Sequence, residues 1–273
     1  MRKLFLMNLL LFVGLGSVLA SNDSTKYFQP TAAHMKEARI ITQILDYYHY
    51  RDIDLDDSLS SVILDNFIQA LDGNKNYFLA SDIRSFQKYR FSIDDDLKNG
   101  NLVTPFFIFN IYKKRLDDRL TYALNRSKEP FNFSTDESIE LDREKMPYAQ
   151  TSDELDDLWR KNIKSQALNL KLSGSDAAKI EEVLVTRYER FQSNVDKYND
   201  NDVFEIFMNS VTEAFDPHTS YFTPLNAEDF EMQSKKSLEG IGATLQQDND
   251  FTKIVELRPG GPAFLSGEID KDD

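Results

Sequence analysis

The chain has 273 residues and a net charge of −14, from 32 Lys and Arg against 46 Asp and Glu. Nucleic-acid binding needs clustered cations, so this charge and the lack of a basic stripe argue against a nucleic-acid partner. The absence of Cys excludes disulfides, thiolate metal sites and a cysteine nucleophile. Hydrophobic residues make up 41% of the chain, which is enough for a folded core and argues against a disordered tail.

Residues 1–20 have the pattern of an export signal. Arg2 and Lys3 precede an apolar run of about 16 residues, which is too short and too interrupted for a stable membrane span. Val18-Leu19-Ala20 places small residues where a signal peptidase cleaves. We therefore expect an exported protein whose mature chain begins near Ser21, and a retained membrane anchor is the alternative. No Cys follows the apolar run, which excludes a lipid-anchored lipoprotein.

Glycine and proline divide the rest of the chain into two parts. Residues 31–215 contain three Gly and three Pro, whereas residues 216–273 contain five Gly and four Pro. Such a shift in composition indicates a change of structural class. We expect a helical domain over 21–215, a connecting turn segment over 216–229, and a unit containing strands over 230–273.

Four helices are expected before residue 130. Their apolar residues recur at three- and four-residue steps, as in Phe106, Phe109 and Tyr112. Ser81 is expected to cap the third helix, Gly100 to end it and Pro105 to open the fourth. The expected ranges are 38–48, 59–70, 81–100 and 105–120.

Three more helices are expected after an irregular stretch over 131–150. Thr151 and Glu154 have the spacing of a capping box for the first of them. Gly174 ends that helix, and Ser175 is expected to cap the next one. The expected ranges are 151–170, 175–195 and 202–215.

Short alternating runs predict a hairpin in the last part of the chain. Ile241 to Leu245 and Phe251 to Leu257 each alternate in the manner of a half-buried strand, with a turn over 247–250. Pro259 to Ala263 then turns the chain into a short helix that ends near Gly267. The expected fold is mainly α, followed by a small α+β unit.

The sequence offers no catalytic or metal-binding motif. His34 and His49 lie on expected helices without metal-ligand spacing and are expected to be structural. His218 stands beside two hydroxyl residues, but Asp216-Pro217-His218-Thr219 is better interpreted as a rigid turn that ends the last helix. The acidic runs at 94–96 and 156–157 are expected to be solvated faces. We expect no cofactor and no metal.

The candidate binding site is the segment Ser237-Leu238-Glu239-Gly240-Ile241-Gly242, directly before a strand. Two glycines around one apolar residue let three successive amides turn toward one point, which forms a nest for an anion. A peptide that pairs with the strand could place its C-terminal carboxylate there, as PDZ domains bind chain ends. A plain tight turn is the alternative. The candidate peptide-binding residues are Leu238, Gly240, Ile241, Gly242, Ala243, Thr244 and Leu245.

Three motifs in order resemble the carboxy-terminal processing peptidases. They are Asp216-Pro217-His218-Thr219-Ser220-Tyr221-Phe222, then Ser237 to Ala243, then Pro259-Gly260-Gly261-Pro262-Ala263. The upstream helical region is similar to the tail-specific protease branch of this family. The resemblance implies a mainly α chain in which a multi-helix domain precedes the first part of an α+β PDZ domain, incomplete over 230–273.

The resemblance also implies a function. The family consists of periplasmic serine endopeptidases that use a Ser/Lys dyad and degrade proteins from their C-termini. Their PDZ domain recognises apolar C-terminal tails, and the helical domain docks a lipoprotein adaptor in relatives, so peripheral membrane association is also implied. The dyad lies downstream of the PDZ domain, so no residue here is nominated as catalytic and this chain alone is expected to be inactive. A non-catalytic exported module that binds tails or an adaptor, and a helical structural protein with a vestigial tail, are the alternatives.

Overall fold

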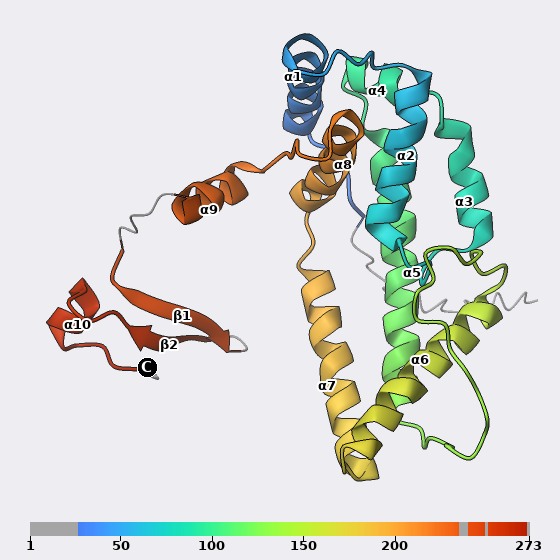
Figure 1. Ribbon diagram of the computed structural model, residues 1–273, viewed down its shortest axis with the longest axis vertical. Coiled ribbons are helices and arrows are strands. Elements are labelled where there is room, and N and C mark those ends of the chain that lie inside the picture. Colours follow the sequence, from blue (N-terminus) through green and yellow to red (C-terminus); the bar gives the residue numbers. More distant parts are fainter. Residues whose placement is uncertain (1–26, 235–239, 249–250, 272–273) are drawn as a thin grey trace, which may run out of the picture.

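The computed structural model describes residues 27–234, 240–248 and 251–271, and it is mainly helical with a small hairpin near the C-terminus (Figure 1). The mainly helical fold predicted from the sequence is confirmed. The expected signal peptide lies outside the described residues. The elements in chain order are α1 (Ala32–Tyr48), α2 (Asp57–Asp72), α3 (Ala80–Phe86), a 3₁₀ turn (Gln87–Tyr89), α4 (Ile93–Asn99), α5 (Val103–Ser127), α6 (Ser152–Leu172), α7 (Ala177–Asp196), α8 (Asp200–Phe215), α9 (Pro224–Ser234), β1 (Ala243–Asp248), β2 (Phe251–Leu257) and α10 (Pro262–Ser266).

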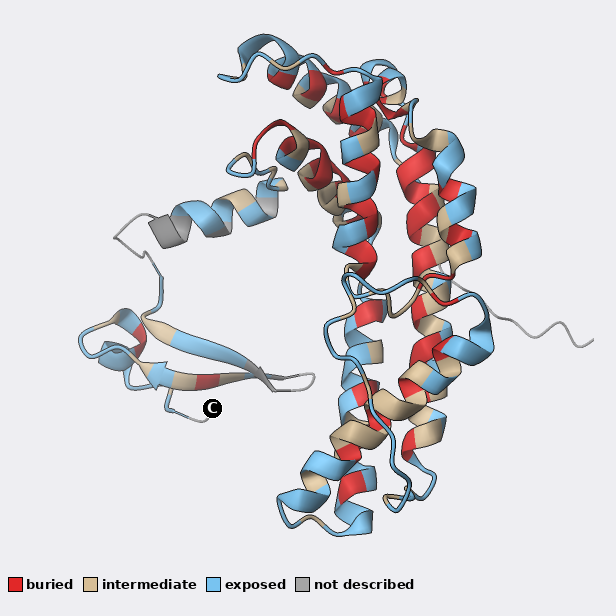
Figure 2. Ribbon diagram, turned by 45° about the vertical axis from the view of Figure 1, so that its right-hand side comes forward, coloured by how far each residue is buried: buried red, intermediate tan, exposed pale blue. Residues whose placement is uncertain are grey.

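The helical part is built around α5, which packs against α6, α7 and α8, while α2 packs against α4 and α8. Buried residues lie on the faces that these helices turn toward one another (Figure 2). Phe67 of α2 and Phe207 of α8 meet edge to face with ring centroids 5.3 Å apart, an arrangement that the ring quadrupoles favour. Most of the aromatic residues that the sequence places at helical spacing are therefore core, although Tyr48 of α1 is 83% exposed. Fully buried rings include those of Phe28, Phe67, Phe78, Phe86, Phe109, Phe204, Phe207 and Phe215.

The helix predicted over 81–100 is divided into α3 and α4. Arg90 lies at the break and donates to both carboxylate oxygens of Asp65 on α2, at 2.9 and 2.7 Å. The hydroxyl of Ser60, also on α2, accepts from the N–H of Ile93 at 2.9 Å. The bond from Ile93 to Ser60 replaces a local helical one, and the Arg90 side chain anchors the break to α2, so tertiary contacts divide the helix that the sequence periodicity predicts.

The N-terminus of α3 also differs from the prediction, because Ser81 does not cap it. Leu79 occupies the cap position, and the Asp82 carboxylate accepts the Leu79 N–H at 2.9 Å. Asp82 also pairs with Arg115 of α5 at 2.9 Å. A carboxylate in the first turn satisfies a free N–H and opposes the helix dipole, so it replaces the predicted hydroxyl cap.

The caps of α6 and α7 follow the prediction in part. Thr151 accepts from the N–H of Glu154 at 3.3 Å, as predicted. The Glu154 carboxylate reaches back to the N–H of Gln150 at 2.8 Å, one residue beyond the predicted partner. The cap of α7 is Asp176 and not Ser175, since the Asp176 carboxylate accepts from the third N–H of the helix at 2.8 Å.

The acidic runs that the sequence assigns to solvated faces are solvated in part, since Asp95 and Asp157 are exposed while one residue of each run is more buried and forms an ion pair. Asp94 is 5% exposed and pairs with Lys98 in the next turn of α4 at 3.3 Å. Asp156 of α6 pairs with Arg119 of α5, which lies 37 residues away in the sequence. The i,i+4 spacing of Asp94 and Lys98 is visible in the sequence, whereas the partner of Asp156 comes from the packing of α5 against α6, which sequence spacing does not reveal.

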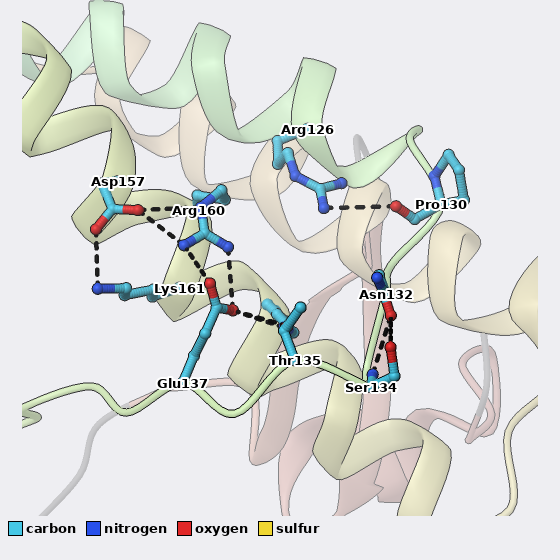
Figure 3. Close-up of polar contacts among 10 residues, drawn as sticks. Arg126, Pro130, Asn132, Ser134, Thr135, Glu137, Asp157, Arg160 and Lys161 are labelled. Atoms are coloured by element: carbon cyan, nitrogen blue, oxygen red, sulfur yellow. Dashed lines mark hydrogen bonds and ion pairs between the residues drawn. The ribbon is translucent and has the colours of Figure 1, made fainter.

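The stretch over 131–150 contains no helix, as predicted, and it is tied to α6 by ion pairs (Figure 3). Glu137 accepts from Arg160 at 2.7 Å and from Lys164 at 2.6 Å. Arg160 also pairs with Asp157 at 2.8 Å, so it bridges two carboxylates. The hydroxyl of Thr135 lies 2.5 Å from the Lys164 ammonium. These contacts fix the backbone of the stretch against α6 without regular secondary structure.

Hydrogen bonds from Arg160 and then Lys164 lower the pKa of Glu137 from its ordinary 4.5 to about 2. Because the folded pKa is the lower one, the stabilisation is present above about pH 4.5 and is lost as the pH falls through about 2. We expect Glu137→Gln to speed amide hydrogen exchange over 131–140 at pH 7. Glu144→Gln, on an exposed residue of the same stretch, is the control. Equal exchange rates in both variants would show that the ion pairs do not hold the segment.

The C-terminal elements form a two-stranded antiparallel sheet followed by a short helix. The register pairs Ala243 with Leu257 and Asp248 with Phe251, and it shifts between Thr244 and Leu245, where β2 carries an extra residue. The predicted turn falls partly on residues 249–250, which lie outside the described residues. In Figure 1 the hairpin lies apart from the helical domain, and α9, which the sequence did not predict, leads toward it.

Within the described residues, none of the helices combines the length and the hydropathy that a bilayer crossing requires.

Candidate peptide-binding site

The loop before β1 is shaped by Gly242. Its φ of +76° is a left-handed conformation that glycine adopts without strain. A Cβ added to Gly242 would lie 3.0 Å from the Cα of Gly261, so the two backbones approach too closely for any side chain. The reason for glycine here is therefore both the backbone angle and the packing against the turn that precedes α10.

Backbone hydrogen bonds tie this loop to the end of β2 and to α10. The carbonyl of Ile241 accepts from the N–H of Ala263 at 2.8 Å, and the carbonyl of Gly242 accepts from the N–H of Arg258 at 2.7 Å. The carbonyls of Ile241 and Gly242 thus point toward the end of β2 and the start of α10. The turn over 259–263, which the sequence singled out, is the partner that holds the loop in place.

The amides of Gly240, Ile241 and Gly242 take part in no hydrogen bond between residues that the structure describes. Successive backbone N–H groups without protein acceptors can bind an anion such as a carboxylate. Leu238, the first residue of the predicted site, lies outside the described residues. The other predicted residues, Gly240 to Leu245, form one continuous loop and strand.

The strand β1 is paired on one side only among the described strands, because the sheet consists of β1 and β2. Ile241 is 50% exposed and Leu245 is 52% exposed, although the sequence pattern predicts a half-buried strand. Ile241 before β1 and Leu245 within it are thus open to solvent, next to a strand edge that no described strand pairs with. Such an edge can pair with an extended peptide.

The three histidines lie outside this loop. His34 is buried, stacks on Phe204 with ring centroids 4.7 Å apart, and hydrogen-bonds Asn201 at 2.8 Å. It also contributes to the capping box of α1, so its predicted structural role is confirmed. His218 forms part of a turn in which its N–H donates to Asp216 at 2.6 Å, as predicted. No group of three or more metal-ligating side chains occurs in the part of the chain that the structure describes.

The fold therefore defines a mainly α-helical protein that carries a small hairpin unit with an open strand edge. Residues 41–225 match the family described as the tail specific protease N-terminal domain, and the chain belongs to this family. The match runs from within α1 to the first turn of α9. The resemblance seen in the sequence is thereby confirmed.

One relative aligns with most of this chain over a minor part of its own length. Over 230 residues the chain is 39% identical to the tail-specific protease of Haemophilus influenzae. The aligned region covers 84% of this chain and 33% of the relative. The chain thus spans about a third of the length of the curated relative that it matches.

Proposed function

We propose that this chain is the N-terminal part of a periplasmic, C-terminal-processing serine endopeptidase, and that its own role is recognition. In this proposal residues 230–273 are the first part of a PDZ domain that binds apolar C-terminal tails. The observation that carries it is the loop over 240–242, whose amides have no acceptor among the described residues and which lies beside the open edge of β1. The name of the relative supports the same reading.

The binding geometry follows from these groups. The C-terminal carboxylate of a peptide would accept from the amides of Gly240, Ile241 and Gly242, and the peptide backbone would pair with Ala243, Thr244 and Leu245. The exposed side chain of Ile241 would contact the terminal apolar side chain, and Leu238 is the other candidate. Peptide binding would therefore combine an anion contact with strand addition.

The proposal assigns no peptidase chemistry to this chain. The family resemblance implies a Ser/Lys dyad downstream of the PDZ domain, and no residue of this chain is proposed as a member of it. The aligned region covers a third of the relative. We therefore propose that the 273-residue chain alone does not cleave peptides. The lipoprotein adaptor and the peripheral membrane contact stay predictions.

The test compares a free-acid peptide with its C-terminal amide on a chain extended to complete the domain. Amidation removes the charge that the loop amides would hold, so we expect about 30- to 150-fold weaker binding, or about 2–3 kcal/mol. Fluorescence anisotropy of a labelled peptide measures both affinities.

A Gly242→Val variant tests the same loop from the protein side, and Gly260→Val is its matched control. A β-branched side chain resists a φ of +76° and would collide with Gly261, so binding of the free acid should weaken. Gly260→Val also has a positive φ but meets no atom within 4 Å, so it controls for backbone strain. Equal affinities for the acid and the amide would rule out carboxylate recognition by this loop.

A further inference from the structure

The segment that follows α8 is held to the helical domain by side chains from several elements. We call residues 216–226 the strap. It begins where α8 ends and includes the first turn of α9. In Figure 1 the strap and α9 form the described connection that leads from the helical domain toward the hairpin.

The first attachment of the strap is at Asp216, which is 4% exposed. Its carboxylate accepts from the hydroxyl of Tyr50, in the loop between α1 and α2, and from the N–H of His218. Arg51 of the same loop donates to the carbonyl of Phe215 at 2.7 Å. Two charge-assisted hydrogen bonds thus join the end of α8 to the loop after α1. The Asp216 carboxylate is the charged group in one, and the Arg51 guanidinium is the charged group in the other.

His49 adds a contact from the same loop. Its Nδ1 lies 3.2 Å from the backbone nitrogen of Arg51, and its Nε2 forms a hydrogen bond with the hydroxyl of Thr219 at 3.1 Å. The imidazole therefore links the loop to the strap through both ring nitrogens. Its ring edge also packs on Phe215, with centroids 5.8 Å apart.

The second attachment is at Tyr221, in the middle of the strap. Asn209 of α8 exchanges two hydrogen bonds with its backbone, accepting from the N–H at 2.8 Å and donating to the carbonyl at 3.1 Å. The Tyr221 hydroxyl donates to Glu37 of α1 at 2.8 Å, and its ring packs edge to face on Phe204. One residue of the strap therefore contacts both α1 and α8.

The third attachment lies in the first turn of α9. The side-chain amide of Asn226 donates to both carboxylate oxygens of Glu205 on α8, at 2.7 and 2.8 Å. Thr223 starts this turn, since its carbonyl accepts from the N–H of Ala227 at 2.8 Å. The direction of α9 is thereby fixed against α8 and is not left to a free linker.

From these three attachments we propose that the strap is a rigid joint that sets the direction of α9 relative to α1 and α8. Three independent attachments within eleven residues leave the segment no free rotation, unlike a flexible linker whose ends alone are held. This inference goes beyond the proposed recognition of C-terminal tails, because it concerns how the chain leaves the helical domain. It does not depend on what the loop before β1 binds.

The absence of Cys allows spin labels to be placed without removing native residues. We would label Glu189→Cys on α7 and Glu228→Cys on α9, both exposed, and measure their distance distribution by pulsed electron paramagnetic resonance. A rigid joint predicts one narrow distribution. Asp216→Ala, which removes an acceptor for two donors, and Asn209→Ala, which removes both hydrogen bonds to the backbone of Tyr221, should each broaden it at least twofold.

Tyr48→Phe is the matched control for Tyr50→Phe, because both tyrosines are exposed and only Tyr50 contacts the strap. Tyr50→Phe should broaden the distribution and Tyr48→Phe should not. Circular dichroism melting confirms that each variant is folded, and if Asp216→Ala is not, Asn209→Ala and Tyr50→Phe decide. A broad distribution in the labelled parent, or no broadening in the folded variants, overturns the proposal.

Discussion

Replacing Gly100 with Ala should lower the free energy of unfolding by about 3–4 kcal/mol. Gly100 ends α4 with a φ of +70°, and its N–H donates to the carbonyl of Leu97. A Cβ at this position would lie 2.4 Å from the carbonyl oxygen of Met35 and 2.8 Å from Cγ of Arg39, both on α1. Because the nearest atom belongs to backbone, α1 and α4 would have to separate.

Gly174→Ala is the matched control, since Gly174 also follows a helix and has a φ of +92° but no atom within 4 Å of an added Cβ. It should cost only the strain of the left-handed conformation, about 1 kcal/mol. Urea unfolding of both variants measures the difference. Similar losses in the two variants would show that α1 moves aside freely, and that the close packing of α4 on α1 contributes little.

These two glycines illustrate what could be predicted from the sequence. Both were expected to end helices, because a glycine after a run of helical periodicity is the usual left-handed terminus, and Gly100 does end α4. The contact of Gly100 with Met35 could not be foreseen, because it depends on how α4 packs against α1. The same limit explains the break between α3 and α4, where Arg90 and Ile93 bond to α2.

The sequence predicts the backbone turns of the candidate site but not the exposure of its side chains. The positive φ of Gly242 and the turn over 259–263 follow from glycine and proline, which leave few other conformations. The exposure of Ile241 and Leu245 did not follow, since alternation indicates which side chains share a face and not whether anything covers that face. The attachments of Tyr221 and Asn226 rest on partners on α1 and α8, so no local pattern predicts them.

Asp72, at the end of α2, is a buried carboxylate whose burial and hydrogen bonds shift its pKa in opposite directions. It is 2% exposed, and it accepts from the N–H groups of Asn76 at 2.7 Å, Tyr77 at 3.1 Å and Phe78 at 2.8 Å. Burial raises its pKa from the ordinary 3.8 to about 6, although these three bonds and Arg143 oppose the rise. The carboxylate thus shapes the turn after α2 while its charge is poorly solvated.

We expect Asp72→Asn to lower the free energy of unfolding by about 2 kcal/mol at pH 7, because one amide oxygen cannot accept from all three N–H groups. The difference should widen as the pH falls. A folded pKa above the ordinary value means that stabilisation is complete below about pH 3.8 and is lost as the pH rises through about 6. The wild type should therefore gain about 2 kcal/mol over the variant between pH 7 and pH 4.

Urea unfolding of the wild type and of Asp72→Asn at several pH values between 4 and 7 measures this difference directly. Other titrating groups cancel in the comparison, because both proteins carry them. Asp54→Asn, on an exposed aspartate of the loop before α2, corrects for loss of a negative charge from an acidic protein. If the wild type instead loses stability relative to Asp72→Asn on acidification, the three N–H bonds outweigh burial. The ionised carboxylate would then be the form that the turn after α2 requires.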